Sequence, residues 1–543
     1  MPVGGDDRHH SPVIEADFVI VGAGSAGCVL ADRLSERGAS VALIEAGPRD
    51  ASPLIHVPAG VIKLMGHPVY DWNYLSAPEP LAAERTFRLP RGKVLGGTSS
   101  TNGMNFVRGL AADYDGWEHS GCVGWRYEDV LPWFKSIERY EGGDPRYRGA
   151  EGPMAVEPYR TILPITHRFV EAAQQAGYLL MNDLNADTRE GVGYSQMSRR
   201  GRFRQSTANT FLASARRRPN LRIETRALAC GLLFSGKRCT GVRFLRHGQE
   251  RKVLARREVL VSAGSVNSPQ LLQISGLGPA SHLRSIGVEV VADLPGVGAN
   301  LSDHYFVPVS ARLEHCLTVN QLRRWPRLGW EIVRWALSGR GALTFGATTA
   351  SLFCRSSPEI AQPDLQLLFF PGSFEVFDAR ELEREPGLRI SVSLARPSSR
   401  GSIMAVSRDP HVPPSIRLNY LCDANDIGVI AAGVGIARRI LSAPALKPYV
   451  VRETGPGPEV QSGASMEVYI RRNGSTVHHL AGTCRMGEDE GAVVDSRLRV
   501  RGIAGLRVID ASIMPRVTTG NTNAPTIMIG AKGAALVLED NRI

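Results

Sequence analysis

The feature that most constrains the fold of this chain is a glycine-rich turn between an apolar segment and a helical one. Residues 17–21 (DFVIV) form a short apolar run, and the turn Gly22-Ala-Gly-Ser-Ala-Gly27 follows it directly. Residues 25–36 have the pattern of a helix and residues 40–45 that of a second strand, so we predict a β-α-β unit. With its fingerprint in register, this unit predicts a dinucleotide site, and a glycine turn without a ligand is the weaker interpretation.

Each glycine of the turn has a physical task in such a site. Gly22 permits the tight turn, Gly24 lets the backbone approach a pyrophosphate, and Gly27 allows the helix to pack closely on the strand. The helix N-terminus stabilises the phosphate charge. Glu45 ends the second strand, where its carboxylate can accept hydrogen bonds from ribose hydroxyls.

Two further segments favour FAD over NAD as the dinucleotide. Residues 505–511 (GLRVIDA) form a short apolar strand that ends in Asp510, which is placed to hold the ribityl or pyrophosphate part of a long, enclosed cofactor. The Gly/Ser-rich loop 91–104 exposes many backbone N–H groups, which can approach a flat ring or phosphates closely.

These segments closely resemble the glucose-methanol-choline (GMC) oxidoreductase family, and the resemblance runs nearly end to end. RGKVLGGTSSTNGMNFVRG (91–109) and GSVNSPQLLQISGLGP (264–279) are similar to the two family signatures. LPGVGANLSDH (294–304), HHLAGTCRMG (478–487) and MPRVTTGNTNAPTIMIG (514–530) match further family segments in the same order. The bacterial choline and alkanol dehydrogenases are the branch that the chain resembles most.

The resemblance places a catalytic base at His479 and its partner at Asn521. A histidine with a pKa near neutrality can take the hydroxyl proton of an alcohol, which eases hydride loss from the carbon. An amide beside it can donate to the developing alkoxide. Adjacent residues of an extended segment face opposite ways, so we assign His478 to packing or to support of the site.

The sequence departs from the family pattern at two positions, and each departure predicts a property of the site. Leu480 stands where relatives have proline, which we expect to loosen the local backbone. Some relatives attach flavin through a histidine in the first-signature loop, whereas this chain has Thr101 there. We therefore predict non-covalent FAD.

The predicted cofactor contacts come from the fingerprint, the 91–109 loop and the strand ends. They are Gly22, Gly24, Ser25, Ala26, Gly27, Glu45, Ala46, Trp72, Arg91, Val94, Gly97, Asn102, Gly103, Met104, Asn105, Ala229, Ala263, Asp510, Ala511, Thr522 and Asn523. No spacing of His and Cys suits a metal, so we predict none.

Composition and charge set limits on partners and location. The chain has 543 residues and a formal charge of +11, but its arginines are scattered rather than clustered with aromatics, so we expect no nucleic-acid partner. A solvated basic surface is the favoured interpretation, with attraction to an anionic membrane as the alternative. Eight scattered cysteines, a polar N-terminus and no apolar run long enough for a membrane span predict a cytoplasmic protein, with attachment to the inner membrane face left open.

The predicted fold is α/β, with a Rossmann-type FAD-binding domain and an interleaved α+β substrate-binding domain built on an antiparallel sheet. We assign residues 14–160, 200–310 and 465–543 to the first domain, and residues 161–199 and 311–464 to the second. The stretch 322–335 (LRRWPRLGWEIVRW) predicts an amphipathic helix that covers the core; a channel lid or an interfacial helix is the alternative.

The resemblance implies oxidation of a primary alcohol to an aldehyde by hydride transfer to flavin N5, with oxygen, a quinone or a dye as electron acceptor. The apolar stretch 342–371 favours a hydrophobic or aromatic alcohol. Two alternatives have the same fold: a flavin-containing lyase like the hydroxynitrile lyases, and a light-driven decarboxylase. A silent FAD-binding protein is the third.

Overall fold

The computed structural model describes residues 14–186, 190–376 and 381–543. Its first residues form a strand of a seven-stranded sheet. Its strands are β1 (Ile14–Val21), β2 (Val41–Glu45), β10 (Leu221–Thr225), β11 (Ala227–Ser235), β12 (Arg238–Arg246), β13 (Gln249–Val261) and β26 (Leu506–Val508). β10, β2, β1 and β13 pair in parallel in that order, and β26 also pairs in parallel with β13. The hairpin strands β12 and β11 continue the sheet antiparallel to β13.

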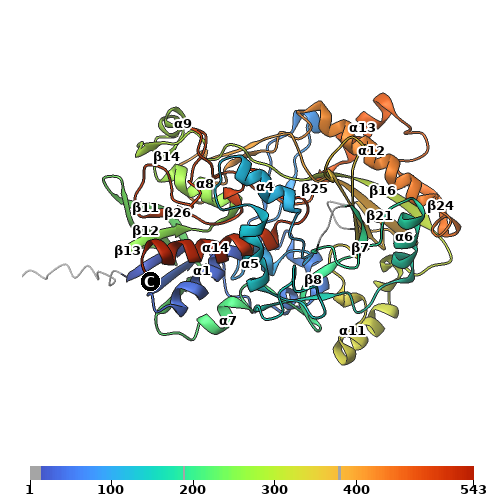
Figure 1. The fold of residues 1–543 in the computed structure, drawn as a ribbon, viewed down its shortest axis with the longest axis horizontal. Helices are drawn as coiled ribbons and strands as arrows, with labels where there is room; N and C mark the ends of the chain where they lie inside the picture. Colours follow the sequence, from blue (N-terminus) through green and yellow to red (C-terminus); the bar gives the residue numbers. More distant parts are fainter. Residues whose placement is uncertain (1–13, 187–189, 377–380) are drawn as a thin grey trace, which may run out of the picture.

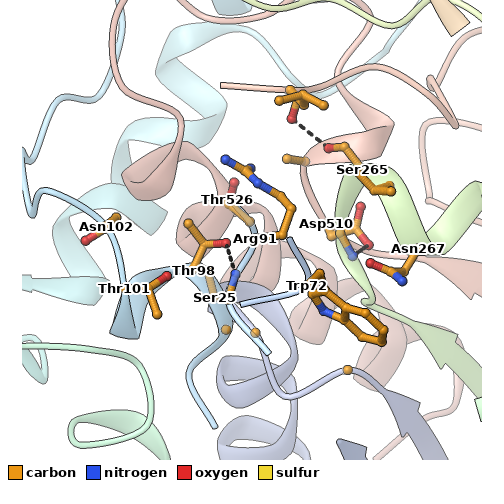
Figure 2. Close-up of a pocket in the computed structure, with 18 of the residues that line it drawn as sticks. Ser25, Trp72, Arg91, Thr98, Thr101, Asn102, Ser265, Asn267, Asp510 and Thr526 are labelled. Carbon is orange, nitrogen blue, oxygen red and sulfur yellow. Dashed lines mark hydrogen bonds between the residues drawn. The ribbon is translucent and has the colours of Figure 1, made fainter. Parts of the chain in front are cut away.

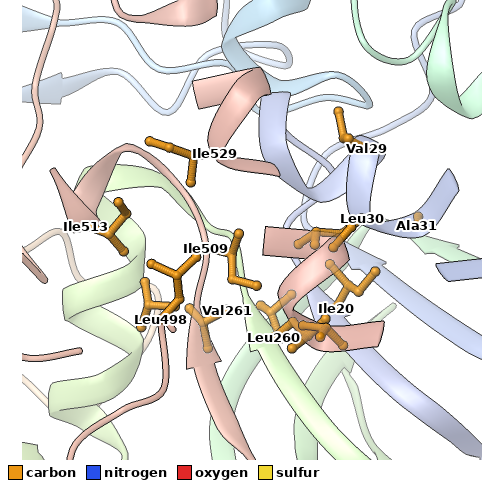
Figure 3. Close-up of a cluster of buried hydrophobic side chains, with 14 of the residues drawn as sticks. Ile20, Val29, Leu30, Ala31, Leu260, Val261, Leu498, Ile509, Ile513 and Ile529 are labelled. Carbon is orange, nitrogen blue, oxygen red and sulfur yellow. The ribbon is translucent and has the colours of Figure 1, made fainter. Parts of the chain in front are cut away.

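Two helices pack together over this sheet. Helix α1 (Ser25–Glu36) follows the glycine turn, and the C-terminal helix α14 (Asn523–Asp540) lies beside it (Figure 1). They approach closely because Gly530 faces Ala26, where a Cβ atom would lie 2.9 Å from the Ala26 Cα. Apolar side chains from both helices and from β1 and β13 meet in one buried cluster (Figure 3).

The structure confirms the predicted β-α-β unit. The helix has the predicted bounds, 25–36, and the second strand starts one residue later than predicted, at Val41. Strand β1 runs further toward the N-terminus than the apolar run alone suggests, because its first residues pair with β13.

A second, antiparallel sheet lies at the other end of the molecule (Figure 1). Its strands are β7 (Gly191–Tyr194), β16 (Tyr305–Leu313), β17 (Ala350–Cys354), β18 (Leu365–Phe370), β21 (Gly387–Leu394), β24 (Val450–Gly455) and β25 (Ser475–Thr476). Helices α6 (Pro164–Gln175), α12 (Ala424–Leu441) and α13 (Gly463–Asn473) accompany it, and their apolar side chains form a second core with the sheet. The predicted combination of a Rossmann-type sheet with an antiparallel sheet is therefore present.

The chain crosses between the two sheets several times, and the division into domains at the predicted residues stays a prediction. One boundary falls inside a strand: β16 runs through residue 310, so residues 305–310 already pair with the antiparallel sheet. Strand β25 joins the same sheet from within the segment 465–543.

Helix α11 (Arg327–Ser338) overlaps the predicted amphipathic stretch 322–335 but starts later and runs beyond it, and the prediction that it covers the core is wrong. Only Glu331 among its residues is buried, and Trp330 is 67% exposed. The helix projects from the edge of the molecule (Figure 1). In the described part of the chain, no helix is long and apolar enough to cross a membrane.

Candidate active site

A long cavity opens at the carboxyl ends of the parallel strands, where open α/β sheets bind ligands. Val21 ends β1, Glu45 ends β2 and Asp510 follows β26, and all three line it. Figure 2 shows side chains from distant parts of the chain, among them Ser25 and Trp72, gathered around this space. The cavity continues to His479 and Asn521 at the border with the second sheet.

The structure brings nearly all of the predicted site residues to this cavity. Both predicted catalytic residues line it, as do all the predicted cofactor contacts except Gly27 and Val94. Gly27 packs instead against the turn, where a Cβ atom would lie 1.9 Å from the Gly22 carbonyl oxygen. Val94 belongs to a small apolar cluster with Ile55 and Leu64. The roles assigned to these residues stay predictions.

At one end of the cavity, Glu45 is buried and already partly bonded. Its carboxylate accepts hydrogen bonds from the backbone N–H groups of Ala23 and Gly47, both at 2.8 Å. Burial raises the pKa of Glu45 to about 7. Since each carboxylate oxygen can accept more than one hydrogen bond, the side chain can still receive ribose hydroxyls.

The glycine turn leaves open space on the cavity side. A Cβ atom added to Gly24 would meet nothing closer than the Ser262 carbonyl oxygen at 3.9 Å, so it would point into the cavity. The 91–104 loop approaches this turn so closely that a Cβ on Gly97 would lie 2.7 Å from the Gly24 Cα. The two loops together form a bare-backbone cradle, which fits phosphates at the N-terminus of α1.

Asp510 binds the N-terminal end of helix α8 (Gly264–Ile274) beside the cavity. Its carboxylate accepts hydrogen bonds from the Gly264 N–H at 2.9 Å, the Ser268 hydroxyl at 2.6 Å and the Ser512 N–H at 2.8 Å. Gly264 begins α8, and the N-terminus of α14 meets that of α1 through a hydrogen bond between Ser25 and Asn523 at 2.8 Å. The N-termini of α1, α8 and α14 all line this cavity, and helix N-termini bind phosphates, so the residues present fit FAD.

His479 lies at the far end of the cavity and has a hydrogen-bond partner on each ring nitrogen. The Asn521 Nδ2 is 3.1 Å from its Nε2, and the His304 Nδ1 is 2.9 Å from its Nδ1. Burial, the neighbouring His304 and His478 and the Arg91 charge hold the pKa of His479 well below its usual value. The imidazole is therefore unprotonated at neutral pH, and the expected pKa near neutrality is not found for this buried ring.

The hydrogen bonds also define which nitrogen carries the proton. An amide nitrogen only donates, so the His479 Nε2 accepts from Asn521 and has no proton of its own. The Nδ1 of the neutral ring then carries the proton and donates a hydrogen bond to the His304 Nδ1. Burial lowers the pKa of His304 to about 4, so this acceptor is neutral too.

The backbone on both sides of His479 is firmly held. The His479 N–H donates to Asp303 at 2.6 Å, and Arg91 donates to the His478 carbonyl at 2.6 Å. The Leu480 carbonyl accepts from the Ser265 hydroxyl at 2.7 Å, so the position where relatives have proline is tied down by a hydrogen bond. The extended backbone expected at His478 is wrong: its φ is 67°, and it lines the cavity together with His479.

Sequence reasoning missed His304 and Asp303, which organise the site. Asp303 is buried and accepts hydrogen bonds from Tyr420, Thr476 and the His479 N–H. Both residues stand in the segment LPGVGANLSDH, which served only as a family match. The adjacent Asp and His of this segment could have been singled out as candidate site residues. Nothing in the local sequence, however, indicates that His304 contacts a histidine 175 positions later.

The sequence is similar to known proteins over nearly its whole length. Two family models, each described as GMC oxidoreductase, match residues 16–306 and 397–530. The chain is similar to oxygen-dependent choline dehydrogenases of Brucella suis, at 40% identity over 531 residues, and Rhizobium johnstonii, at 42% over 534 residues. Each match covers 97% of this chain and 96% of the relative.

Solved structures share the fold. A pyridoxine 4-oxidase from Mesorbium loti matches with a TM-score of 0.87 at 29% identity, over 96% of this chain and 98% of its own. A formate oxidase from Aspergillus oryzae, studied for the modification of its FAD, matches with a TM-score of 0.90 at 25% identity, over 98% and 99%.

Proposed function

Because the chain belongs to the GMC oxidoreductase family, we propose that it oxidises a primary alcohol to an aldehyde, with His479 as general base. The enzyme is an FAD-dependent oxidoreductase that acts on CH–OH donors. Bound FAD supplies the hydride acceptor at its N5 atom. The observation that carries the proposal is the hydrogen-bonded pair of His479 and Asn521 at the end of a cavity that fits the cofactor.

His479 prepares the alcohol for hydride loss. Its unprotonated Nε2 faces the cavity side on which Asn521 lies, and it takes the hydroxyl proton as the C–H bond of the same carbon breaks. Loss of the proton to the imidazole, together with the hydride that bound FAD would accept, would leave an aldehyde. The low pKa of His479 in the buried site keeps the base available at neutral pH.

Asn521 stabilises the charge that develops on the alcohol oxygen. Its Nδ2 donates to the His479 Nε2 and can donate to an alkoxide that takes the place next to that nitrogen. Its Oδ1 is buried and has no hydrogen-bond partner among the described residues, so a substrate hydroxyl can also donate to it before the proton leaves.

His304 acts as a positioning residue in this proposal. By accepting a hydrogen bond from the Nδ1–H of His479, it stabilises the tautomer in which the Nε2 carries no proton and can act as base. Its ring stands nearly perpendicular to that of His479, at an interplanar angle of 89°, which also fixes the orientation of the base.

We expect His304→Leu to lower kcat by about 10- to 100-fold with little change in KM, because the tautomer and orientation of His479 are lost. His304→Asn should restore most of the activity, since an amide oxygen can take the place of the Nδ1 acceptor. Steady-state kinetics on FAD-loaded variants checks this. A leucine variant with normal kcat, or an asparagine variant no better than leucine, would contradict the positioning role.

The FAD is proposed to be non-covalent. Thr101 lines the cavity in the loop where some relatives carry the attachment histidine, and a threonine hydroxyl offers no comparable nucleophile. We expect acid precipitation of the holoenzyme to leave all of the yellow flavin in the supernatant. Flavin that stays with the precipitated protein would show a covalent bond.

The substrate is proposed to be an uncharged hydrophobic or aromatic primary alcohol. Ala347, Thr348 and Leu368 of the apolar stretch line the cavity together with Asn105. The carboxylates among its described lining residues are Glu45, Asp71 and Asp510, and each already accepts backbone N–H bonds. These bonds leave less of their charge to hold a quaternary ammonium group.

A panel of alcohols tests this proposal, with aldehyde formation measured against a dye and separately against oxygen. We expect kcat/KM for benzyl alcohol and hexanol to exceed that for choline, by about tenfold or more if burial of the apolar group decides affinity. A preference for choline, the substrate in the name of the curated relatives, would overturn the hydrophobic assignment but leave alcohol oxidation intact.

Turnover also needs an external electron acceptor, for which we propose oxygen or a quinone, with a dye as a substitute in assays. The relatives are named oxygen-dependent choline dehydrogenases, which supports oxygen as the acceptor. The lyase and decarboxylase alternatives are not favoured, because the matching family models and relatives are oxidoreductases and dehydrogenases.

A further inference from the structure

Helix α11 and the tryptophan before it turn large apolar side chains to solvent. Trp325, Trp330 and Leu337 are 75%, 67% and 80% exposed. Such side chains are normally buried, and a cluster of them on the surface marks an interaction site.

The apolar side chains share one face of the helix. Trp330, Val333 and Leu337 follow the spacing i, i+3, i+7, which lines them up in one stripe. The Trp325 ring packs beside this stripe, over Gly329. We call Trp325, Trp330, Val333 and Leu337 the outward stripe.

The opposite face attaches the helix to the molecule through polar contacts. The Glu331 carboxylate accepts a hydrogen bond from the Ala342 N–H at 2.6 Å, and the Trp335 indole donates to the Arg202 carbonyl at 3.3 Å. These contacts fix the rotation of the helix, so the outward stripe cannot turn inward without breaking them.

Positive charge lies at both ends of the helix that carries the outward stripe. Arg327 and Arg340 are exposed there, whereas the exposed Arg323 and Arg324 donate to the Leu382 and Arg384 carbonyls. The acidic residue of the helix, Glu331, is buried and lies 3.6 Å from Arg334. The face that solvent sees is therefore apolar and basic.

We propose that α11 docks the enzyme on an anionic lipid bilayer, with the outward stripe in the headgroup–acyl boundary and the arginines at lipid phosphates. Apolar residues with tryptophan on one side and arginines at the rim are the composition of an interfacial helix. A second copy of the chain fits less well, because it would bring two sets of arginines together without counter-charge. The proposal does not depend on which alcohol the enzyme oxidises.

Co-sedimentation of the FAD-loaded enzyme with vesicles tests the proposal. The vesicles are phosphatidylcholine alone, or phosphatidylcholine mixed with phosphatidylglycerol. We expect binding to the anionic vesicles and a loss of about tenfold or more in Trp330→Ser/Leu337→Ser. Arg327→Gln and Arg340→Gln should each weaken binding about fivefold at low salt.

Val123→Ser/Leu179→Ser is the matched control, because these side chains are 71% and 73% exposed elsewhere on the surface. It should bind anionic vesicles like the unchanged enzyme. Equal binding by the outward-stripe variant, or no binding by the unchanged enzyme, would overturn the proposal. So would a change of oligomeric state in the outward-stripe variant on size exclusion, which would assign this face to a second copy.

Discussion

His479→Ala is expected to lower kcat by about 100- to 10,000-fold while the enzyme still binds FAD. The alcohol would have to lose its proton to water in a buried site. The Asn521 Nδ2 and the His304 Nδ1 would also lose their hydrogen-bond partner. Rapid-mixing measurement of flavin reduction gives the effect on the chemical step directly, and the flavin spectrum shows that the cofactor is in place.

His478→Ala is the matched control for this experiment. His478 is the neighbouring histidine and also lines the cavity, but the Arg91 hydrogen bond goes to its backbone carbonyl and survives the substitution. We expect a loss of less than about tenfold. If both alanine variants reduced flavin at the same rate, the assignment of the base to His479 would be wrong.

Gly24→Ala is expected to weaken FAD binding by about 5- to 150-fold and to leave the fold intact. The added Cβ atom has room in the protein, since its nearest neighbour would be 3.9 Å away, but it would occupy space in the phosphate cradle. Overfilling a close contact costs about 1–3 kcal/mol. Titration of the apoenzyme with FAD measures the affinity, and thermal unfolding of the apoenzyme measures the fold.

Two other glycines show whether the effect is local to the cradle. Gly435→Ala lies in α12 with nothing within 4 Å of its Cβ and should bind FAD normally. Gly27→Ala would place a Cβ 1.9 Å from the Gly22 carbonyl oxygen, so it should lower the unfolding temperature of the apoenzyme. Unchanged FAD affinity in Gly24→Ala would mean that the pyrophosphate does not approach this turn.

Local sequence was sufficient to predict the nucleotide end of the site. The glycine spacing, the apolar runs and the acid at the second strand end all lie within residues 17–45, and they meet through short-range structure. The approach of His479 to Asn521 could be predicted only from the family resemblance, since no local pattern brings these loops together.

Two features escaped prediction for physical reasons. His304 contacts His479 because strand β16, which begins at Tyr305, pairs with β25, which ends just before the loop that holds His479. Such long-range pairing has no signature in either segment. For α11, the periodicity predicts an apolar stripe correctly, but periodicity is the same whether the stripe faces the core or solvent.

Anaerobic mixing of the holoenzyme with a primary alcohol tests the central claim most directly. We expect the visible absorbance of the oxidised flavin to disappear as one equivalent of aldehyde forms, and to disappear more slowly when the carbinol hydrogens are replaced by deuterium. Flavin that stays oxidised with every alcohol of the panel, choline included, would contradict alcohol oxidation by this enzyme.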